Sequence, residues 1–213
     1  MVEELSDLNG TLCTALPGYH AITGCDYNSC FFGKGKTRPL LVASRYPQFI
    51  QALAELGSSA SVSSATEATL EEFVCAIYGK GQFNNVNEAR KNIFETKFMP
   101  RDDARPLEKV KCLEPTSMPP WKEALIQHIK RANFIARMWK LANEFKPIKE
   151  SPLDNGWIVL GGKTVPNWFE GSQLPDSLEV EQYDYDSEGV DDDSNISRDS
   201  ESDDSENDSD DFN

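Results

Sequence analysis

The spacing of apolar residues predicts helices along most of the first 145 residues. Leucine recurs every three or four positions from Leu5 to Leu16, which places these side chains on one face of a helix, and Pro17 is expected to end that helix. The same periodicity predicts further helices over Thr37 to Ala43, Pro47 to Leu56, Thr69 to Tyr78, Val86 to Phe98 and Trp121 to Phe145. We therefore expect a mainly α fold.

Local signals set the expected ends of several of these helices. Pro39 fits only the first turn of its helix, because proline has no amide hydrogen. Thr69 is expected to cap a helix that Gly79 closes, after a serine-rich loop from Ser58 to Ser64. The longest helix is expected to bury a stripe made of Leu125, Ile129, Ala132, Ala136, Trp139 and Ala142. His128 lies beside that stripe, and we expect it to be packed rather than catalytic.

A short β-hairpin is predicted near residue 160. Two β-prone runs, Trp157 to Leu160 and Lys163 to Val165, flank Gly161 and Gly162, which is a typical hairpin sequence. Trp168 and Phe169 are expected to pack this hairpin onto the helices, because an isolated hairpin is marginal in water. We expect four parts: a helical region over residues 1–99, a proline-rich linker over 100–120, a long helix with the docked hairpin over 121–175, and an acidic tail over 176–213.

Charge separates the tail from the rest of the chain. Residues 176–213 hold 17 acidic side chains against one basic side chain, whereas the other 175 residues hold 19 acidic and 20 basic ones. A segment with so much charge and so little to bury is expected to be disordered. It either serves as a solubilising tail, competes with phosphate for the basic face of the domain, or binds basic proteins such as histones.

The cysteines and the absence of targeting signals indicate a compartment. Five cysteines form an odd, scattered set, which favours reduced thiols. No run of about 18 apolar residues occurs, and the N-terminus lacks a signal-peptide pattern, so we expect no membrane association and an intracellular, nuclear protein. His20, Cys25 and Cys30 lack a fourth ligand and the usual cysteine spacing, so they do not predict a zinc site.

The candidate chemistry lies between residues 26 and 45. Asp26 is a ligand type that suits a hard cation, although a Mg²⁺ site usually needs several carboxylates. The backbone of Gly33 and Gly35, together with the cations of Lys34, Lys36, Arg38 and Arg45, would suit a nucleic-acid phosphate; the alternative is a solvated loop with ordinary surface lysines. Lys130 and Arg131 are expected to form a solvated face of the longest helix.

Two stretches, Thr23-Gly-Cys-Asp-Tyr27 and Phe32-Gly-Lys-Gly-Lys36, resemble the Gly-Cys-Asp-Tyr and Gly-x-Gly-x-Lys pair of the flap-endonuclease (XPG-type) branch of the PIN-domain nucleases. The resemblance implies that Asp26 is a catalytic metal ligand for Mg²⁺ and that the glycine segment grips duplex or branched DNA. Over about residues 12 to 168 the chain is also similar to uncharacterised, mobile-element-associated animal proteins. That similarity rests on His20 to Asp26, Phe73 to Gly79 and Pro119 to Asn133.

One departure from the nuclease pattern governs the expected function. Only 25 residues precede Asp26, and Glu3, Glu4 and Asp7 lie in an expected helix start rather than on strands. We therefore expect the N-terminal half of a PIN-like fold to be absent and the chain alone not to be a competent nuclease. The expected function is nucleic-acid binding through the phosphate backbone, without base specificity. Two alternatives stay open, a protein-interaction module and a nuclease completed by carboxylates from elsewhere.

Overall fold

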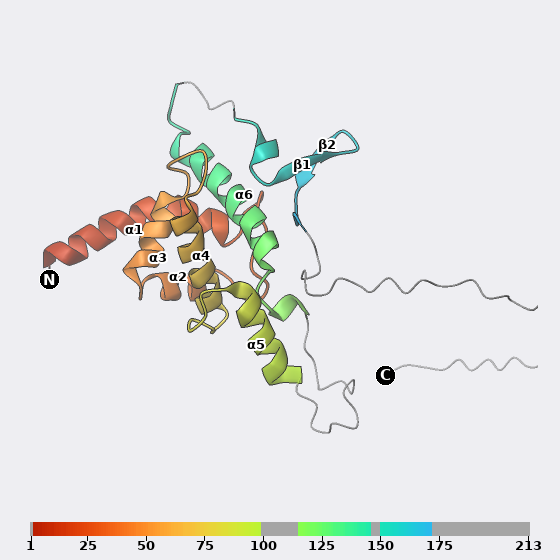
Figure 1. Cartoon of the computed structure of the whole chain (residues 1–213). Helices are drawn as coiled ribbons and strands as arrows, with labels where there is room; N and C mark the ends of the chain where they lie inside the picture. The colour runs from red at the N-terminus through yellow and green to blue at the C-terminus, as the bar shows by residue number, and fades with distance from the viewer. Residues whose placement is uncertain (1, 99–114, 146–149, 172–213) are drawn as a thin grey trace, which may run out of the picture. The chain divides into compact units, whose positions relative to one another are not determined.

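The computed structural model of this protein describes residues 2–98, 115–145 and 150–171 (Figure 1). These residues belong to one compact unit, Met1–Ser172. They form six α-helices and one two-stranded antiparallel hairpin, which confirms the expectation of a mainly α fold. Most of the expected linker and all of the expected acidic tail lie outside the described residues.

The first helix continues through the proline that was expected to end it. Helix α1 runs from Val2 to Ile22 with Pro17 inside it. An internal proline removes one helical hydrogen bond and costs about 3 kcal/mol. The turn that follows Pro17 buries Tyr19 and Ile22 in the core, and burial of side chains of this size contributes about 1.5–3 kcal/mol each. Burial after the proline therefore offsets its cost, and the prediction of an end at Pro17 was wrong.

Three helices lie where their apolar patterns predict them: α2 over Thr37–Ala43, α3 over Pro47–Glu55 and α5 over Val86–Phe98. In α3, proline occupies the first turn, where it loses no helical hydrogen bond. Gly57, in the left-handed region with φ +82°, follows α3 and allows the chain to reverse there.

Helix α4 spans Ser64–Ile77 and begins earlier than expected. The oxygen of the Ser63 side chain accepts a hydrogen bond from the backbone N–H of Thr66 at 3.1 Å, so Ser63 caps the helix. Thr69, the expected cap, lies inside the helix, where its hydroxyl donates to the carbonyl of Ala65. The serine-rich composition thus concealed a helix start in a segment that looked like a loop.

Helix α6 spans Lys122–Lys140 and ends before the expected Phe145. Most of its predicted stripe is buried, including Leu125, Ile129, Ala132 and Ala136. The last expected turn has no such packing, because Phe145 is 97% exposed. Without apolar contact, that turn has nothing to offset the entropy of ordering it as helix.

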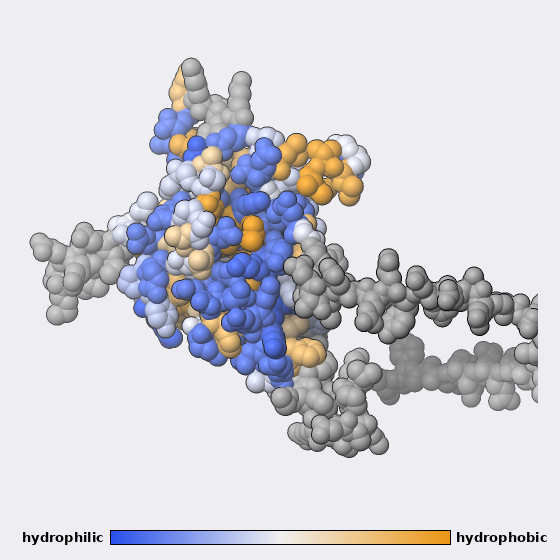
Figure 2. Space-filling model, viewed as in Figure 1, coloured by the Kyte–Doolittle hydropathy of each residue, from blue (hydrophilic) through white to orange (hydrophobic). Residues whose placement is uncertain are grey.

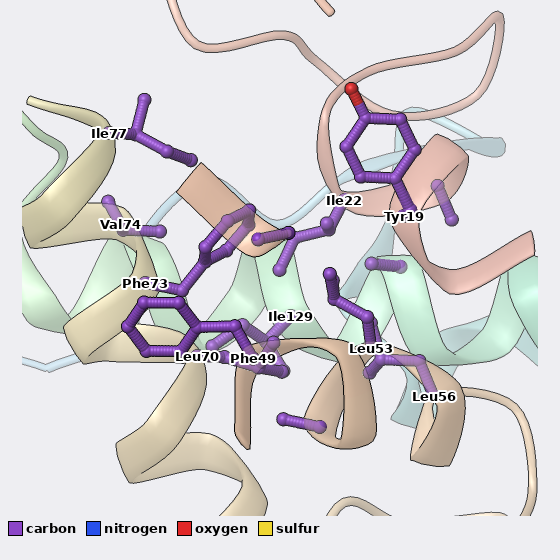
Figure 3. Close-up of a cluster of buried hydrophobic side chains, with 14 of the residues drawn as sticks. Tyr19, Ile22, Phe49, Leu53, Leu56, Leu70, Phe73, Val74, Ile77 and Ile129 are labelled. Carbon is purple, nitrogen blue, oxygen red and sulfur yellow. The ribbon is translucent and has the colours of Figure 1, made fainter. Parts of the chain in front are cut away.

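The core lies where α1, α3, α4 and α6 meet. Figure 3 shows Phe49 of α3 beside Phe73 of α4, with ring centroids 5.4 Å apart. Ile22 of α1 and Leu53 of α3 belong to the same cluster. Tyr19 borders it, and its hydroxyl donates a hydrogen bond to the carbonyl of Lys36. The core therefore ties the end of α1 to the segment that leads into α2.

The hairpin is confirmed, with β1 over Trp157–Leu160 and β2 over Lys163–Pro166. Gly161 and Gly162 have φ +57° and +74°, as a two-residue hairpin turn requires. Trp157 packs on Phe134 of α6, with ring centroids 5.3 Å apart. In Figure 2 much of the hairpin is coloured as hydrophobic, with paler atoms at its turn, whereas most of the helical surface in that view is hydrophilic. Trp168, expected to anchor the hairpin, is 59% exposed.

Candidate functional site

The Gly-Cys-Asp-Tyr segment forms a tight turn after α1. Cys25 and Asn28 exchange backbone hydrogen bonds, with N–H···O distances of 2.9 and 3.3 Å, so Asp26 and Tyr27 occupy the exposed tip. Gly24 has φ +110°, and a Cβ atom there would lie 2.6 Å from Cβ of Cys30. Glycine is therefore needed for this close crossing of the chain. The backbone geometry therefore accounts for the glycine of the Gly-Cys-Asp-Tyr pattern.

Asp26 supplies one carboxylate at the tip of this turn. Within the described part of the chain, no three histidine, cysteine, aspartate or glutamate side chains come together as a metal site. The described residues therefore do not fit the Mg²⁺ centre that the nuclease resemblance implies, because such a centre needs several oxygen ligands. His20, Cys25 and Cys30 all lie near the end of α1, but the Nδ1 atom of His20 is 2.8 Å from the amine of Lys36.

Lys36 is engaged with the C-terminal end of α1. Its amine donates hydrogen bonds to the carbonyl of His20 at 3.0 Å, the hydroxyl of Thr23 at 2.9 Å and the carbonyl of Gly24 at 2.5 Å. The C-terminus of a helix carries partial negative charge and unpaired carbonyls, so a cation there stabilises it. Partial burial lowers the pKa of Lys36 from its usual value. Lys36 therefore holds two chain segments together.

The other predicted cations lie along the segment from Gly33 to Arg45. Lys34 lies over the ring of Tyr78, with its amine 4.2 Å from the ring centroid. Nη2 of Arg38 is 3.3 Å from the place that a Cβ atom would take on Gly79, just after α4. Arg45 is exposed after α2. These three cations therefore follow one another along the segment that runs from the glycines through α2.

The two glycines of this segment leave their backbone open. Gly33 and Gly35 have φ +67° and +57°, and a Cβ atom on either would meet nothing within 4 Å. The backbone N–H of Lys34 donates to the carbonyl of Phe31 at 3.1 Å. A ligand can therefore approach this backbone more closely than one that carries side chains.

The structure also places a buried polar cluster beneath the hairpin, and short-range sequence patterns do not reveal it. Arg131 was expected on a solvated face but is only 2% exposed. Its Nε donates to Oδ1 of Asn28 at 3.1 Å, and its Nη1 donates to the carbonyls of Gly156 at 3.1 Å and Asn167 at 2.6 Å. The expectation of a solvated Arg131 was wrong because the chain after α6 folds back over this face of the helix. Lys130, the neighbouring residue, pairs with Glu170 at 3.8 Å.

His128 belongs to the same cluster, and its expected packing is confirmed. Its Nε2–H donates to the carbonyl of Ile22 at 2.7 Å, and its Nδ1 lies 3.3 Å from the hydroxyl of Ser29. Burial lowers the pKa of His128 to about 4, so the ring is neutral at pH 7. A neutral ring with Nε2 protonated can accept a hydrogen bond at Nδ1 from Ser29.

The segments that carry the sequence resemblance therefore meet in space. His128 joins the third segment to Ile22 in the first, and Arg131 joins it to Asn28 just after the first. Tyr78 of the second segment packs edge-on against Phe31, with centroids 6.3 Å apart. The motifs are visible in the sequence, but only the fold shows that His128 of the third segment is bonded to Ile22 of the first.

Comparisons with protein-family models, with curated proteins and with solved structures gave no significant match to this chain. The relation to flap endonucleases thus stays a prediction that rests on the residues named above. Among the helices that the structure describes, none combines the length and the apolar character needed to cross a membrane.

Proposed function

We propose that this chain binds the phosphate backbone of nucleic acid through Gly33, Lys34, Gly35, Arg38 and Arg45. The observation that carries the proposal is the open backbone of the two left-handed glycines beside exposed cations. Exposed backbone N–H groups and cations are the groups that hold phosphate oxygens. Lys36 is not part of the proposed contact, because its amine is bonded to carbonyls at the end of α1.

The distribution of ion pairs favours this location. Several other cations of the described surface lie within 4 Å of a carboxylate, which reduces their net field: Lys91 with Glu95, Lys122 with Glu71, Lys130 with Glu170 and Arg137 with Glu150. In the described part of the chain, Arg38 and Arg45 have no such carboxylate partner. The charges of Arg38 and Arg45 are therefore not offset by a carboxylate within 4 Å among the described residues, and a polyanion would be attracted to them.

The proposal covers binding and not cleavage. Contacts of this kind reach phosphate and carry no base information, so we propose sequence-independent binding of duplex or branched DNA. The resemblance of Gly33 to Lys36 to the DNA-gripping element of the flap-endonuclease branch supports the same class of ligand. Asp26 alone does not supply a metal centre, so no Mg²⁺-dependent step is part of the proposal.

A protein-interaction module is the second candidate, and one observation favours it. Leu40 and Leu41 of α2 and the neighbouring Tyr46 are exposed on the same surface as the arginines. Apolar side chains gathered on a surface are more typical of contact with protein than with phosphate. The two candidates predict different sensitive residues, arginines for nucleic acid and leucines for a protein.

The test measures binding of the full chain to a short labelled DNA duplex by fluorescence anisotropy over a range of salt concentrations. Replacing Arg38→Gln and Arg45→Gln together should weaken binding and make the slope of log K against log salt shallower by about 1.8, since each phosphate contact contributes about 0.9. The matched control, Leu40→Ala with Leu41→Ala, changes the same helix without changing charge and should leave the slope as it is. No measurable binding at low salt, or an unchanged slope in the arginine variant, would overturn the proposal.

A further inference from the structure

A cavity of about 180 Å³ lies beside the buried polar cluster. Its walls come from the loop after the Gly-Cys-Asp-Tyr turn, from the end of α4, from the residues before α6, and from one face of α6. Cys30, Phe32, Tyr78, His128, Arg131 and Trp168 are among its lining residues. The cavity is thus apolar on most sides and has one cation in its wall.

Arg131 is a buried charge without a described counter-charge. None of the carboxylates in the described residues lies within 4.0 Å of its guanidinium group; its three hydrogen bonds go to neutral oxygens. Those bonds use the single N–H of Nε and both N–H groups of Nη1. The described residues give Nη2 no hydrogen bond, so two donors of the guanidinium group remain for a ligand.

A buried arginine that has unused N–H groups and no described counter-charge favours the binding of an anion. Removing a charge from water costs several kcal/mol unless an opposite charge or well-placed dipoles replace the water. Burial lowers the pKa of Arg131 to about 10, so the group still carries its charge at pH 7. The neighbouring His128 is neutral at that pH and adds no second positive charge.

The other lining residues indicate the size and the apolar character of the rest of the ligand. The indole ring of Trp168 lies over the guanidinium group, 5.2 Å from its central carbon. Phe32 and Tyr78 add aromatic surface on other sides. A cavity of about 150 Å³ accommodates benzene, so this one has room for one small ring with a carboxylate. A nucleic-acid backbone is too large for it.

We propose that this cavity binds a small carboxylate with an aromatic or apolar body, and that Nη2 of Arg131 holds its carboxylate oxygen. The apolar body packs among Phe32, Tyr78 and Trp168. This inference does not depend on the proposed nucleic-acid binding, which uses Arg38 and Arg45 outside the cavity. It adds a second ligand of a different chemical class.

The test uses benzoate as the probe, with benzamide as a neutral molecule of nearly the same shape. Cys30 lines the cavity and is exposed, so its alkylation by iodoacetamide in the native full chain reports occupancy. Cys13 is an exposed thiol of α1 that does not line the cavity, and it serves as an internal control. Mass spectrometry of digested samples follows both residues in one experiment.

At a benzoate concentration four times its Kd, alkylation of Cys30 should slow about fivefold, because only about one fifth of the cavities stay empty. Alkylation of Cys13 should not change, and benzamide should protect neither thiol. Equal protection of Cys30 by benzamide would show an apolar cavity without charge recognition and would overturn the proposal. Failure of benzoate to protect Cys30 at any concentration up to its solubility would also overturn it.

Two variants complete the test. Arg131→Met keeps most of the buried side-chain volume and should abolish protection by benzoate. If that variant does not fold, Trp168→Ala serves instead, because this side chain is mostly exposed and its loss should leave the fold intact. Trp168→Ala should weaken protection severalfold by removing one wall; unchanged protection in either folded variant would refute the assigned position of the ligand.

Discussion

A substitution at Lys36 tests whether this cation stabilises the fold or binds a ligand. Replacing Lys36→Met keeps the length of the side chain and removes the ammonium group. The change leaves the carbonyls of His20 and Gly24 and the hydroxyl of Thr23 without their donor at the end of α1. We expect the variant to fold with lower stability and to keep its affinity for DNA.

The magnitude follows from the contacts that are lost. A hydrogen bond from a charged group contributes about 1.5–3 kcal/mol, and a cation at a helix C-terminus contributes about 0.3–1 kcal/mol. Lys36 is exposed, so water can replace some of its bonds in the variant. The expected loss is therefore about 2 kcal/mol of unfolding free energy, which lowers Tm by about 4–8 °C in a chain of this size.

Urea denaturation followed by far-UV circular dichroism measures this loss. Lys163→Met is the matched control, because Lys163 is exposed in the hairpin and should change the stability by less than about 0.5 kcal/mol. The DNA salt slope is measured below the denaturation range of both variants. Unchanged stability of Lys36→Met, together with a slope shallower by about 0.9, would refute the reasoning and assign the ammonium group to a phosphate.

Two further predictions test the packing of α1 and the burial of the histidine. Gly18→Ala should destabilise the protein by about 1–3 kcal/mol, because its Cβ would lie 2.1 Å from the carbonyl oxygen of Leu53. Gly10→Ala in the same helix is the control: its Cβ would meet nothing within 4 Å, so it should stabilise the protein by about 1 kcal/mol. Urea midpoints of the two variants that move in the same direction would contradict this. The pKa of His128 is about 4 in the folded chain and about 6.5 in the unfolded chain. As pH falls from 6.5 to 4, the unfolded chain therefore binds a proton at His128 before the folded chain binds one. The free energy of unfolding should fall by about 3 kcal/mol over this range. Denaturation across that pH range should show a shallower fall in His128→Gln, and an equally steep fall would rule out this histidine as the cause.

Much of the secondary structure follows from short-range patterns. Helices α2 and α5 have the predicted ends, α3 ends within one residue of its prediction, and the hairpin turn lies at Gly161 and Gly162. Each of these elements is specified by features a few residues apart, such as apolar spacing, a proline in a first turn or a pair of glycines. The exposed position of Arg38 and Arg45 likewise agrees with what their local sequence suggests.

The sites depend on partners that are distant in the sequence. The bond between Arg131 and Asn28 joins residues 103 positions apart, and the bond between His128 and the carbonyl of Ile22 joins residues 106 positions apart. An arginine on an amphipathic helix looks like a surface residue until a later segment folds over it. The same holds for Lys36, whose role depends on where α1 ends.

The sequence by itself determined the mainly α class, most of the element positions and the basic segment after the Gly-Cys-Asp-Tyr turn, because propensity and periodicity act over a few residues. Only the tertiary structure decided that α1 passes through Pro17, that Lys36 holds the end of that helix, and that Arg131 lies in a cavity wall. Burial and long-range hydrogen bonds set these three outcomes, since they can outweigh a local preference of about 1–3 kcal/mol.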